Sequence, residues 1–288
     1  MAAQTHKATQ EEPLRALLAR ALAGATGKRI EQLLRFKSVA VNGEVVVRGA
    51  HPLQPGDVVT IHFDKRPAAR AVLEQGLKIV HEDPDIIVVD KPPGLLSIAT
   101  DHERERTAYA IVTEYARSRA ADGRVFVVHR LDKGTSGLLM FARSEAVKRA
   151  LQDGWRDVEK KYFAVVEGAP TPPADTIRTQ LRENKGLEVY STEDGDGSEA
   201  ITEYRTVKRG RKHALLEVTL QTGKKNQIRV HLAERGHPVA GDKKYGAHAN
   251  PAGRLGLHAC SLSFTHPVRG ERIRLTSALP VALAALLT

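Results

Sequence analysis

The residues best suited to chemistry lie in one short segment, His129 to Gly137, with the sequence HRLDKGTSG. An apolar stretch, Val125 to Val128, predicts a strand that leads into this segment, and Leu138 to Phe141 predicts a strand after it. Asp132 is therefore expected where a strand becomes a loop. The two glycines of the segment permit backbone conformations closed to other residues and the close approach of a bulky substrate. A carboxylate here could be catalytic, or it could be a structural ion pair or turn cap.

A nucleophilic triad is one alternative for the same segment, because Ser136, His129 and Asp132 are the residue types of a serine hydrolase. The G-x-S-x-G elbow is missing, and three members within eight residues rarely reach triad geometry. A hydrolase that uses Ser136 is therefore a minor alternative.

Metal and nucleotide chemistry find little support in the sequence. No tight H-x-x-x-H pair occurs, and no G-x-x-x-x-G-K-[ST] phosphate loop is present. Cys260 is the one cysteine, so an intrachain disulfide is impossible and a buried apolar thiol is expected. We predict neither a metal site nor a cofactor. The histidines that cluster late in the chain are His231, His237, His248, His258 and His266.

The composition favours a polyanionic partner. The chain has 288 residues, a formal net charge of +10 and a sequence pI near 9.7. Cationic side chains that neutralise phosphates release condensed counterions, so nucleic acid is the first partner to consider. No apolar run approaches the roughly 20 residues that span a bilayer, and the polar N-terminus lacks a signal core. We expect a soluble, cytoplasmic protein that does not bind membranes.

Two domains are expected from the length and from the pattern of elements. Residues 1–12 predict a polar tail, and residues 13–64 a small module of two helices and a hairpin that turns at Asn42-Gly43. Residues 65–76 carry several cations without apolar periodicity, which indicates a basic linker.

Residues 77–288 predict the larger domain, in which strand patterns alternate with helical ones. The predicted helices cover 107–120, 145–155 and 226–235. The predicted strands include 86–89, 124–128, 138–141, 162–166 and 215–220. This mixture predicts an α+β fold with a mixed, largely antiparallel sheet.

The segment HRLDKGTSG resembles the HRLDxxTSG signature of RluA-type RNA pseudouridine synthases. The resemblance spans residues 77–288 and implies the pseudouridine synthase fold. Residues 13–64 look like the S4-like RNA-binding domain that often precedes this catalytic domain, with Lys28, Arg29, Arg35 and Lys37 as RNA-binding candidates. The other matching segments are Ile87 to Gly94, Lys161 to Gly168, Glu199 to Tyr204, Thr222 to His231, Gly241 to Gly246 and Leu257 to Ala259.

The resemblance implies roles for three residues. Asp132 is the essential carboxylate, which acts in its ionised form on the ribose or base of the target uridine. We hypothesise that Arg229 keeps it charged through a close ion pair, with its planar fork matched to the carboxylate. Tyr162 is expected against the target base, and its hydroxyl is a candidate for proton transfer.

Substrate contacts are also implied for other residues near these three. A uridine in folded RNA must be flipped out at a cost of a few kcal/mol, and Arg130 is expected to fill the vacated space. Two positions depart from the family pattern T-G-R-x-H-Q-I-R-V-H: Lys224 replaces an arginine and Asn226 a histidine. Lys224 keeps the charge but weakens bidentate phosphate recognition. The remaining substrate-binding candidates are His129, Thr135, Gln227, Ile228 and Leu257.

Taken together, the sequence predicts a monomeric RNA pseudouridine synthase without cofactor or metal. Its N-terminal module favours large-subunit ribosomal RNA as the substrate, with transfer RNA as an alternative. A non-catalytic RNA-binding or ribosome-assembly protein that retains the fold is the alternative from another class.

Overall fold

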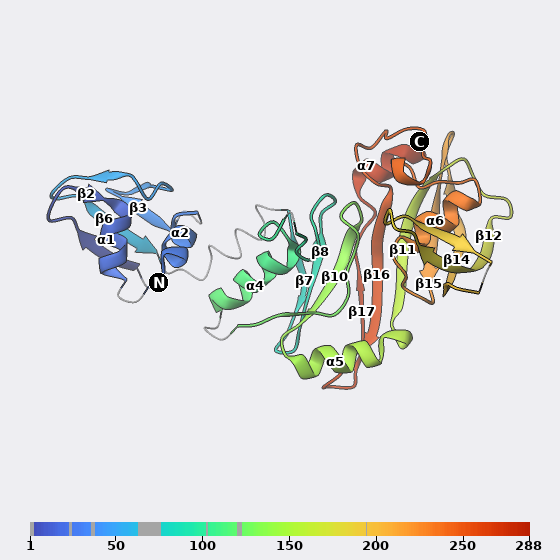
Figure 1. Cartoon of the computed structure of the whole chain (residues 1–288), viewed down its shortest axis with the longest axis horizontal. Coiled ribbons are helices and arrows are strands. Elements are labelled where there is room, and N and C mark those ends of the chain that lie inside the picture. Colours follow the sequence, from blue (N-terminus) through green and yellow to red (C-terminus); the bar gives the residue numbers. More distant parts are fainter. Residues whose placement is uncertain are drawn as a thin grey trace. The chain divides into compact units, whose positions relative to one another are not determined.

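A computed structural model of the chain describes residues 3–22, 25–35, 38–62, 76–101, 103–119, 123–193 and 195–288. The chain divides into two compact units, one of Met1–Gln75 with Glu114–Asp122 and one of Gly76–Thr113 with Gly123–Thr288. Figure 1 draws the residues before the first long grey segment in blue and the rest from teal to red. The basic linker expected at 65–76 lies, except for its last residue, outside the described residues.

The first unit contains the two helices and the hairpin that the sequence predicted. Leu14, Leu18, Ile30 and Leu34 are buried in one core, because the helical spacing of these apolar residues puts them on one face of each helix. Its elements are β1 (Ala3–Lys7), β2 (Glu12–Pro13), α1 (Leu14–Ala21), α2 (Gly27–Arg35), β3 (Val39–Val41), β4 (Glu44–Val45), β5 (Pro52–Leu53) and β6 (Val58–His62).

The sheet of this unit has the strand order β1-β6-β3-β4, and β2 pairs separately with β5. Asn42 and Gly43 both have positive φ angles, 51° and 87°, which a tight hairpin turn between β3 and β4 requires. The strand β1 pairs antiparallel with β6 from Ala3 to Lys7. Part of the segment that we expected to be a polar tail therefore belongs to the sheet.

The second unit is built on a sheet of eleven strands in the part of the chain that the structure describes. They are β7 (Lys78–Glu82), β8 (Ile86–Lys91), β9 (Phe126–Val127), β10 (Ser136–Ala142), β11 (Glu159–Glu167), β12 (Ala174–Glu183), β13 (Val189–Thr192), β14 (Ser198–Arg209), β15 (His213–Leu220), β16 (Leu257–Thr265) and β17 (Arg272–Thr276). Its helices are α5 (Glu145–Asp153), α6 (Gln227–Glu234) and α7 (Val281–Ala284), with short 3₁₀ helices at Trp155–Asp157, Lys243–Tyr245 and Ala285–Leu287. The helix α4 (Ala108–Arg119) belongs to this unit up to Thr113.

The order of the main sheet is β13-β12-β14-β15-β11-β16-β10-β8-β7, with β9 on β10 and β17 on β16. Among the described strands the pairings are antiparallel except for β10 with β16, where Ser136 pairs with His258 and Gly137 with Ala259. Figure 1 shows β10 and β16 near the middle of this unit. The predicted α+β class with a mixed, largely antiparallel sheet is confirmed.

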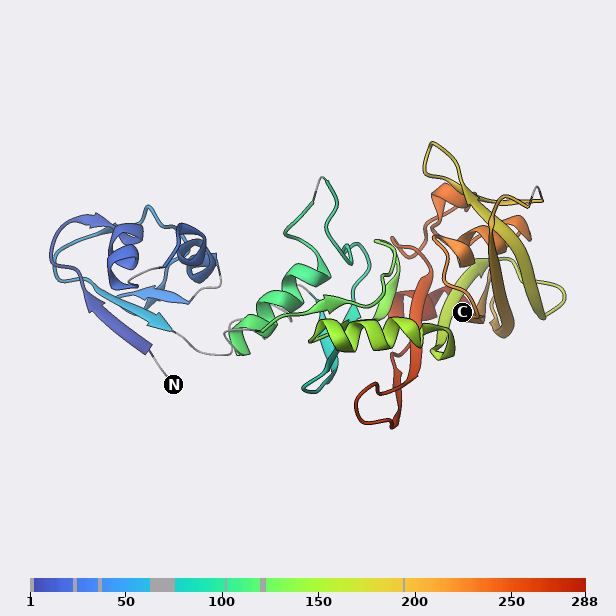
Figure 2. The same cartoon turned by 60° about the horizontal axis from the view of Figure 1, so that its bottom comes forward.

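The helices cover the sheet with their apolar sides. In α5, the hydroxyl of Ser144 accepts a hydrogen bond from the amide of Val147 and caps the helix start, while Val147 and Leu151 are buried beneath it. In both views α6 lies against the β12 to β15 end of the sheet (Figure 1, Figure 2). Ile228 and Leu232 of α6 are buried there. None of the described helices is long and apolar enough to cross a membrane.

Candidate active site

The loop between β9 and β10 carries Asp132, and hydrogen bonds from residues 91–97 hold this loop in place. The hydroxyl of Ser97 donates to the carbonyl of Leu131 at 2.7 Å and accepts from its amide at 3.0 Å. The amide of Gly94 donates to the carbonyl of Lys133 at 2.7 Å. Asp132 therefore sits on a backbone whose neighbours on both sides are held in place.

Lys91 is fully buried beneath this loop. Its ammonium group donates to three carbonyls, those of Leu95 at 2.8 Å, Pro92 at 3.0 Å and Lys133 at 3.4 Å. Burial lowers the pKa of Lys91 to about 7, and the charge of Asp132 partly opposes this shift. Lys91 lies in the segment Ile87 to Gly94 that matches the family, and its burial could not be read from that match.

Gly137 is the position in the loop where the chain needs glycine. Its φ is +109°, and a Cβ atom there would lie 2.2 Å from the carbonyl oxygen of Ala259 on β16. The parallel contact between β10 and β16 forms where this loop ends. A side chain at residue 137 would force the two strands apart and displace the loop.

A pocket of about 240 Å³ opens in front of the loop. It brings together all ten site residues that the sequence analysis proposed in the second unit, although they come from segments far apart in the chain. The pocket is lined by His129, Arg130, Leu131, Asp132, Thr135, Trp155, Lys160, Tyr162, Leu220, Gly223, Lys224, Asn226, Gln227, Ile228, Arg229 and Leu257.

Arg229 contacts Asp132, but its planar fork is matched to another carboxylate. Its Nε and Nη2 atoms donate to the two oxygens of Asp242 at 2.6 and 2.8 Å, whereas Nη1 reaches Oδ2 of Asp132 at 3.3 Å. The side chain of Asp242 is 1% exposed and that of Asp132 is 29% exposed. A buried carboxylate depends more strongly on a full complement of donors. The predicted fork between Arg229 and Asp132 is thus corrected to one single hydrogen bond.

Two further contacts hold the Arg229 guanidinium in place. Nη1 also donates to the side-chain oxygen of Asn226 at 2.8 Å, and the guanidinium carbon lies 4.9 Å from the centre of the Tyr245 ring. The amide nitrogen of Asn226 donates to the Tyr245 hydroxyl at 2.9 Å. Asn226, which departs from the family pattern, is therefore part of the support for Arg229.

Tyr162 lies on β11 and lines the pocket beside Asp132. Burial raises the pKa of its hydroxyl, and the negative charge of Asp132 raises it further. The hydroxyl therefore stays protonated at neutral pH. In this state Tyr162 offers a ring surface and a hydrogen-bond donor to whatever occupies the pocket.

His129 forms part of the pocket wall as a neutral side chain. Its Nε2 atom accepts a hydrogen bond from the amide of Met140 at 3.0 Å, and its ring centre lies 4.7 Å from that of Trp155. Burial lowers the pKa of His129 to about 3, with a further contribution from the charge of Lys160. Because Nε2 is occupied, only the opposite edge of the His129 ring remains for contact with a substrate.

Gln227 lines the pocket, but the protein itself uses its polar groups. Its amide nitrogen donates to Ile201 O at 3.0 Å and to Thr202 Oγ1 at 2.9 Å. Its oxygen accepts from Thr222 Oγ1 and from the amide of Lys224, both at 2.9 Å. Gln227 therefore fixes the start of α6 and serves the pocket as a wall.

The other predicted pocket residues divide into a buried and an exposed group. Thr135, Ile228 and Leu257 are buried, whereas Arg130 and Lys224 are exposed. The apolar members can only form walls. The two cations are free to meet a charged substrate at the pocket's edge.

Ser136 does not form the triad with His129 and Asp132 that we considered. It is 3% exposed and does not line the pocket, and its Oγ lies 2.8 Å from Nδ1 of His258. Arg254 donates to the same hydroxyl at 2.6 Å. The serine is enclosed in the protein and is not positioned as a nucleophile.

The hydrogen-bond chain continues beyond His258. The Nε2 atom of His258 lies 3.1 Å from Ser277 Oγ, and Ser277 donates to Asp90 at 2.6 Å. The chain therefore connects β10, β16 and β8 under the Asp132 loop. Because it ties three strands together outside the pocket, we assign this hydrogen-bond chain a structural role.

The RNA-binding candidates of the first unit are only partly described. Arg29 is exposed on α2. Lys28 and Arg35 belong to the same helix, but their side chains lie outside the description, and Lys37 lies outside the described residues.

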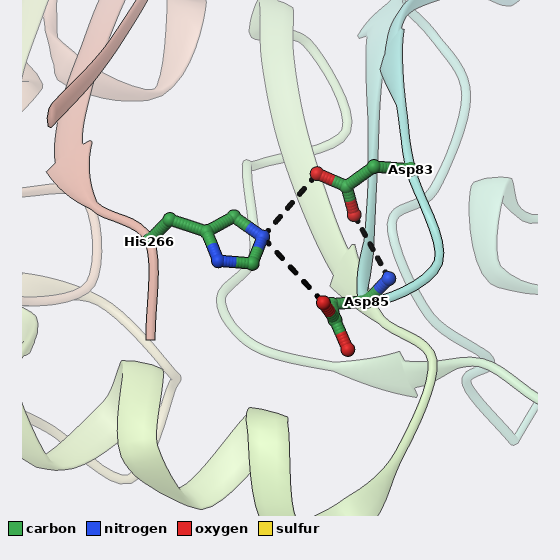
Figure 3. A group of neighbouring side chains, drawn as sticks. All are labelled: Asp83, Asp85 and His266. Atoms are coloured by element: carbon green, nitrogen blue, oxygen red, sulfur yellow. Dashed lines mark hydrogen bonds and ion pairs between the residues drawn. The ribbon is translucent and has the colours of Figure 1, made fainter. Parts of the chain in front are cut away.

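Asp83, Asp85 and His266 form a polar cluster elsewhere in the second unit (Figure 3). Nε2 of His266 lies 3.3 Å from Asp83 and 3.8 Å from Asp85, while its Nδ1 accepts the amides of Val268 and Arg269. Because Nδ1 accepts these two hydrogen bonds, the proton of the neutral ring is on Nε2, the atom nearest the two carboxylates, which does not suit a metal ligand. Arg269 also donates to Asp83 at 2.9 Å. The contacts of His266 and Arg269 with Asp83 join the loop after β16 to the turn between β7 and β8.

Residues 85–234 match the family described as RNA pseudouridylate synthase. The chain is 33% identical to the uncharacterized RNA pseudouridine synthase YlyB of Bacillus subtilis, over 90% of this chain and 88% of that protein. It is 32% identical to the ribosomal large subunit pseudouridine synthase D of Vibrio cholerae, over 88% and 83%. The solved structure of human RNA pseudouridylate synthase domain containing 4 has the same fold, with a TM-score of 0.63 at 24% identity over 78% of this chain and 96% of that one.

Proposed function

The chain belongs to the RNA pseudouridylate synthase family, and we propose that it isomerises uridines of large-subunit ribosomal RNA with Asp132 as the essential carboxylate. As an RNA pseudouridine synthase it is an isomerase. The reaction breaks the bond between base and ribose, rotates the base and forms a carbon–carbon bond in its place.

The role of Asp132 is supported by its contact with Arg229, 97 residues further along the chain, inside a pocket that Tyr162 also lines. Arg229 binds Oδ2 of Asp132, and Oδ1 accepts no hydrogen bond from the described residues. The guanidinium pairs with one oxygen of the carboxylate and leaves the other oxygen to act on the ribose or base.

Tyr162 and the apolar walls would hold the flipped base. The ring of Tyr162 provides a flat surface next to Asp132, and Ile228 and Leu257 provide apolar contact. Because its hydroxyl stays protonated, Tyr162 acts in this proposal as a donor and a packing surface. Abstraction of a proton would require the phenolate, which its raised pKa disfavours.

Arg130 is the residue we assign to the space that the flipped uridine leaves in the RNA. It follows His129 in the pocket wall and is exposed, so its guanidinium can extend into a bound RNA while Asp132 stays in the pocket. A planar guanidinium can stack on the neighbouring bases and offset part of the unstacking cost.

We assign large-subunit ribosomal RNA as the target because a relative that matches over most of both chains is named for this activity. We further propose that the first unit is an S4-like RNA-binding domain. Its two helices, its small sheet and the exposed Arg29 suit this role, and the whole chain has a net charge of +10 that favours an RNA partner.

The test of Asp132 is the variant Asp132→Asn, which keeps the shape and removes the charge. We expect it to fold like the parent and to lose isomerisation of ribosomal RNA, measured by mapping pseudouridines. Asp153→Asn is the matched control, because Asp153 is an exposed acid at the end of α5 outside the pocket. Equal turnover by Asp132→Asn and the parent would refute the catalytic assignment.

The RNA target is tested by mapping pseudouridines in cells with and without the protein. Loss of sites in large-subunit ribosomal RNA is the expected result. Loss confined to transfer RNA would replace the target by that alternative, and no loss in any RNA would favour a non-catalytic RNA-binding or ribosome-assembly protein.

A further inference from the structure

Lys160 is a buried cation of the pocket to which the sequence analysis gave no role. It lies on β11, two residues before Tyr162, and is 6% exposed. Its ammonium nitrogen donates to the carbonyl of Trp155 at 3.1 Å and lies 5.6 Å from the centre of the Trp155 ring. The described residues provide no carboxylate partner for it.

The other buried cations around the pocket are better satisfied. An ammonium group has three N–H donors. Lys91 directs its donors at three carbonyls, and Arg229 has the carboxylates of Asp242 and Asp132. Among the described residues Lys160 has one carbonyl acceptor, and burial lowers its pKa with no acid of this part of the chain to oppose the shift. A buried charge with so few partners is unfavourable for the free protein unless a ligand supplies the missing anion.

The charges of the pocket indicate what that ligand is. Asp132 is the one acid among the lining residues, and Arg229 already contacts it. Lys160 therefore contributes positive charge that nothing inside the pocket neutralises. A nucleotide that enters the pocket carries its own anion, the phosphate group.

We propose that Lys160 binds a phosphate group of the target uridine nucleotide, so that base and phosphate are recognised in one pocket. This inference rests on the proposed function, because it takes a nucleotide as the occupant. Trp155 holds the ammonium group on one side through its carbonyl and ring, which leaves the remaining N–H donors for the phosphate oxygens. Lysine suits this task as a compact point charge.

The binding test uses the full-length protein and the fluorescence of Trp155, which is the one tryptophan of the chain and contacts Lys160. The probes are uridine, uridine 5′-monophosphate, uridine 3′-monophosphate and inorganic phosphate, each titrated into the parent and into Lys160→Met and Lys160→Arg. For the parent we expect one of the two monophosphates to bind roughly tenfold more tightly than uridine, the usual effect of a charge-assisted hydrogen bond.

In Lys160→Met the advantage of the monophosphate over uridine should disappear, while binding of uridine itself is unchanged. Lys160→Arg should keep most of the advantage. The matched control is Lys185→Met, which removes the same charge from an exposed turn outside the pocket. Thermal unfolding of each variant checks that the fold is retained.

Three results would overturn the inference: equal binding of uridine and both monophosphates to the parent, an unchanged phosphate advantage in Lys160→Met, or a weaker binding of uridine itself in that variant. The third result would mean that Lys160 contacts the base. Failure of the proposed function gives a different outcome, because phosphate-dependent binding through Lys160 would persist in a protein that isomerises no RNA.

Discussion

The guanidinium of Arg229 binds Asp242 through two hydrogen bonds and Asp132 through one, so a buried carboxylate outside the pocket orients the arginine that contacts the proposed catalytic acid. Asp242 is almost fully enclosed, and its position fixes the plane of the guanidinium. Arg229 is then pre-positioned to present Nη1 to Asp132 before any RNA binds.

Replacement of Arg229 by lysine should therefore reduce catalysis although the charge is kept. An ammonium group cannot hold Asp242 with a fork and still contact Asp132, and a displacement of about 1 Å in an active site can reduce the rate roughly 100-fold. We expect a fall of this size in the single-turnover rate of Arg229→Lys. Arg235→Lys, at the exposed end of the same helix, is the control and should be unaffected. A parent-like rate for Arg229→Lys would show that this contact is dispensable.

Lys91 predicts a specific dependence of stability on pH. Its pKa is about 7 in the folded protein, against 10.5 for an ordinary lysine. Between these values the unfolded chain binds more protons at this site than the folded chain, so the contribution of Lys91 to stability rises with pH. Lys91→Met should lower stability overall and lack this rise from pH 7 to 10.5. Denaturant unfolding from pH 7 to 10.5 measures this, and Lys78→Met is the control because Lys78 is exposed. The prediction is wrong if the free energy of unfolding has the same slope against pH in the parent and in Lys91→Met.

Ser136→Ala should destabilise the protein without abolishing its chemistry. The substitution leaves Arg254 and His258 without their shared partner, which costs about 1–3 kcal/mol of unfolding free energy when polar groups are buried. Ser261→Ala is a suitable comparison, because the hydroxyl of Ser261 is buried and has no hydrogen-bond partner among the residues that the structure describes, so its loss should be nearly neutral. If Ser136→Ala folds stably and loses all catalytic turnover, Ser136 would again be a candidate nucleophile, as in the hydrolase alternative.

Much of the fold could be predicted from local patterns. The helices α4, α5 and α6 agree with the predicted ranges to within one or two residues at each end. For α5 the local signal is strong, because Ser144 caps its start and its apolar residues Val147 and Leu151 lie on one buried face. The strands β12 to β14 were not predicted. Their outward positions are polar and exposed, so the alternation is weak, and their pairing partners are set by the sheet as a whole.

The site was predictable in its membership but not in its pairings. The family resemblance brought Asp132, Tyr162 and Arg229 together, and all three line one pocket. That Arg229 gives its fork to Asp242 depends on how deeply each carboxylate is buried, which spacing along the chain does not reveal. Lys160 was missed for the same reason, since a lysine at the start of a strand is usually exposed.

Lys160→Met should leave the free energy of unfolding unchanged or raise it. The buried ammonium group has one carbonyl acceptor, and exchanging a poorly paired buried charge for an apolar side chain of similar length removes a desolvation penalty. Denaturant unfolding of the free protein measures this, with Lys185→Met as the surface control. A clear loss of stability would mean that Lys160 is a structural residue, in contrast to a cation kept for its ligand.

The RNA-binding role of the first unit predicts an effect of Arg29 on salt dependence. If Arg29 contacts one phosphate, Arg29→Gln should weaken binding to a structured fragment of large-subunit ribosomal RNA, and the slope of log affinity against log salt should fall by about 0.9. Arg149→Gln in α5 removes an exposed arginine from the second unit outside the pocket and should leave the slope unchanged. The slope measures the number of counterions released, so the loss of one phosphate contact lowers it. A partly misfolded variant would instead bind more weakly at every salt concentration, and this difference separates the two causes. An unchanged slope for Arg29→Gln would remove Arg29 from the RNA-binding surface.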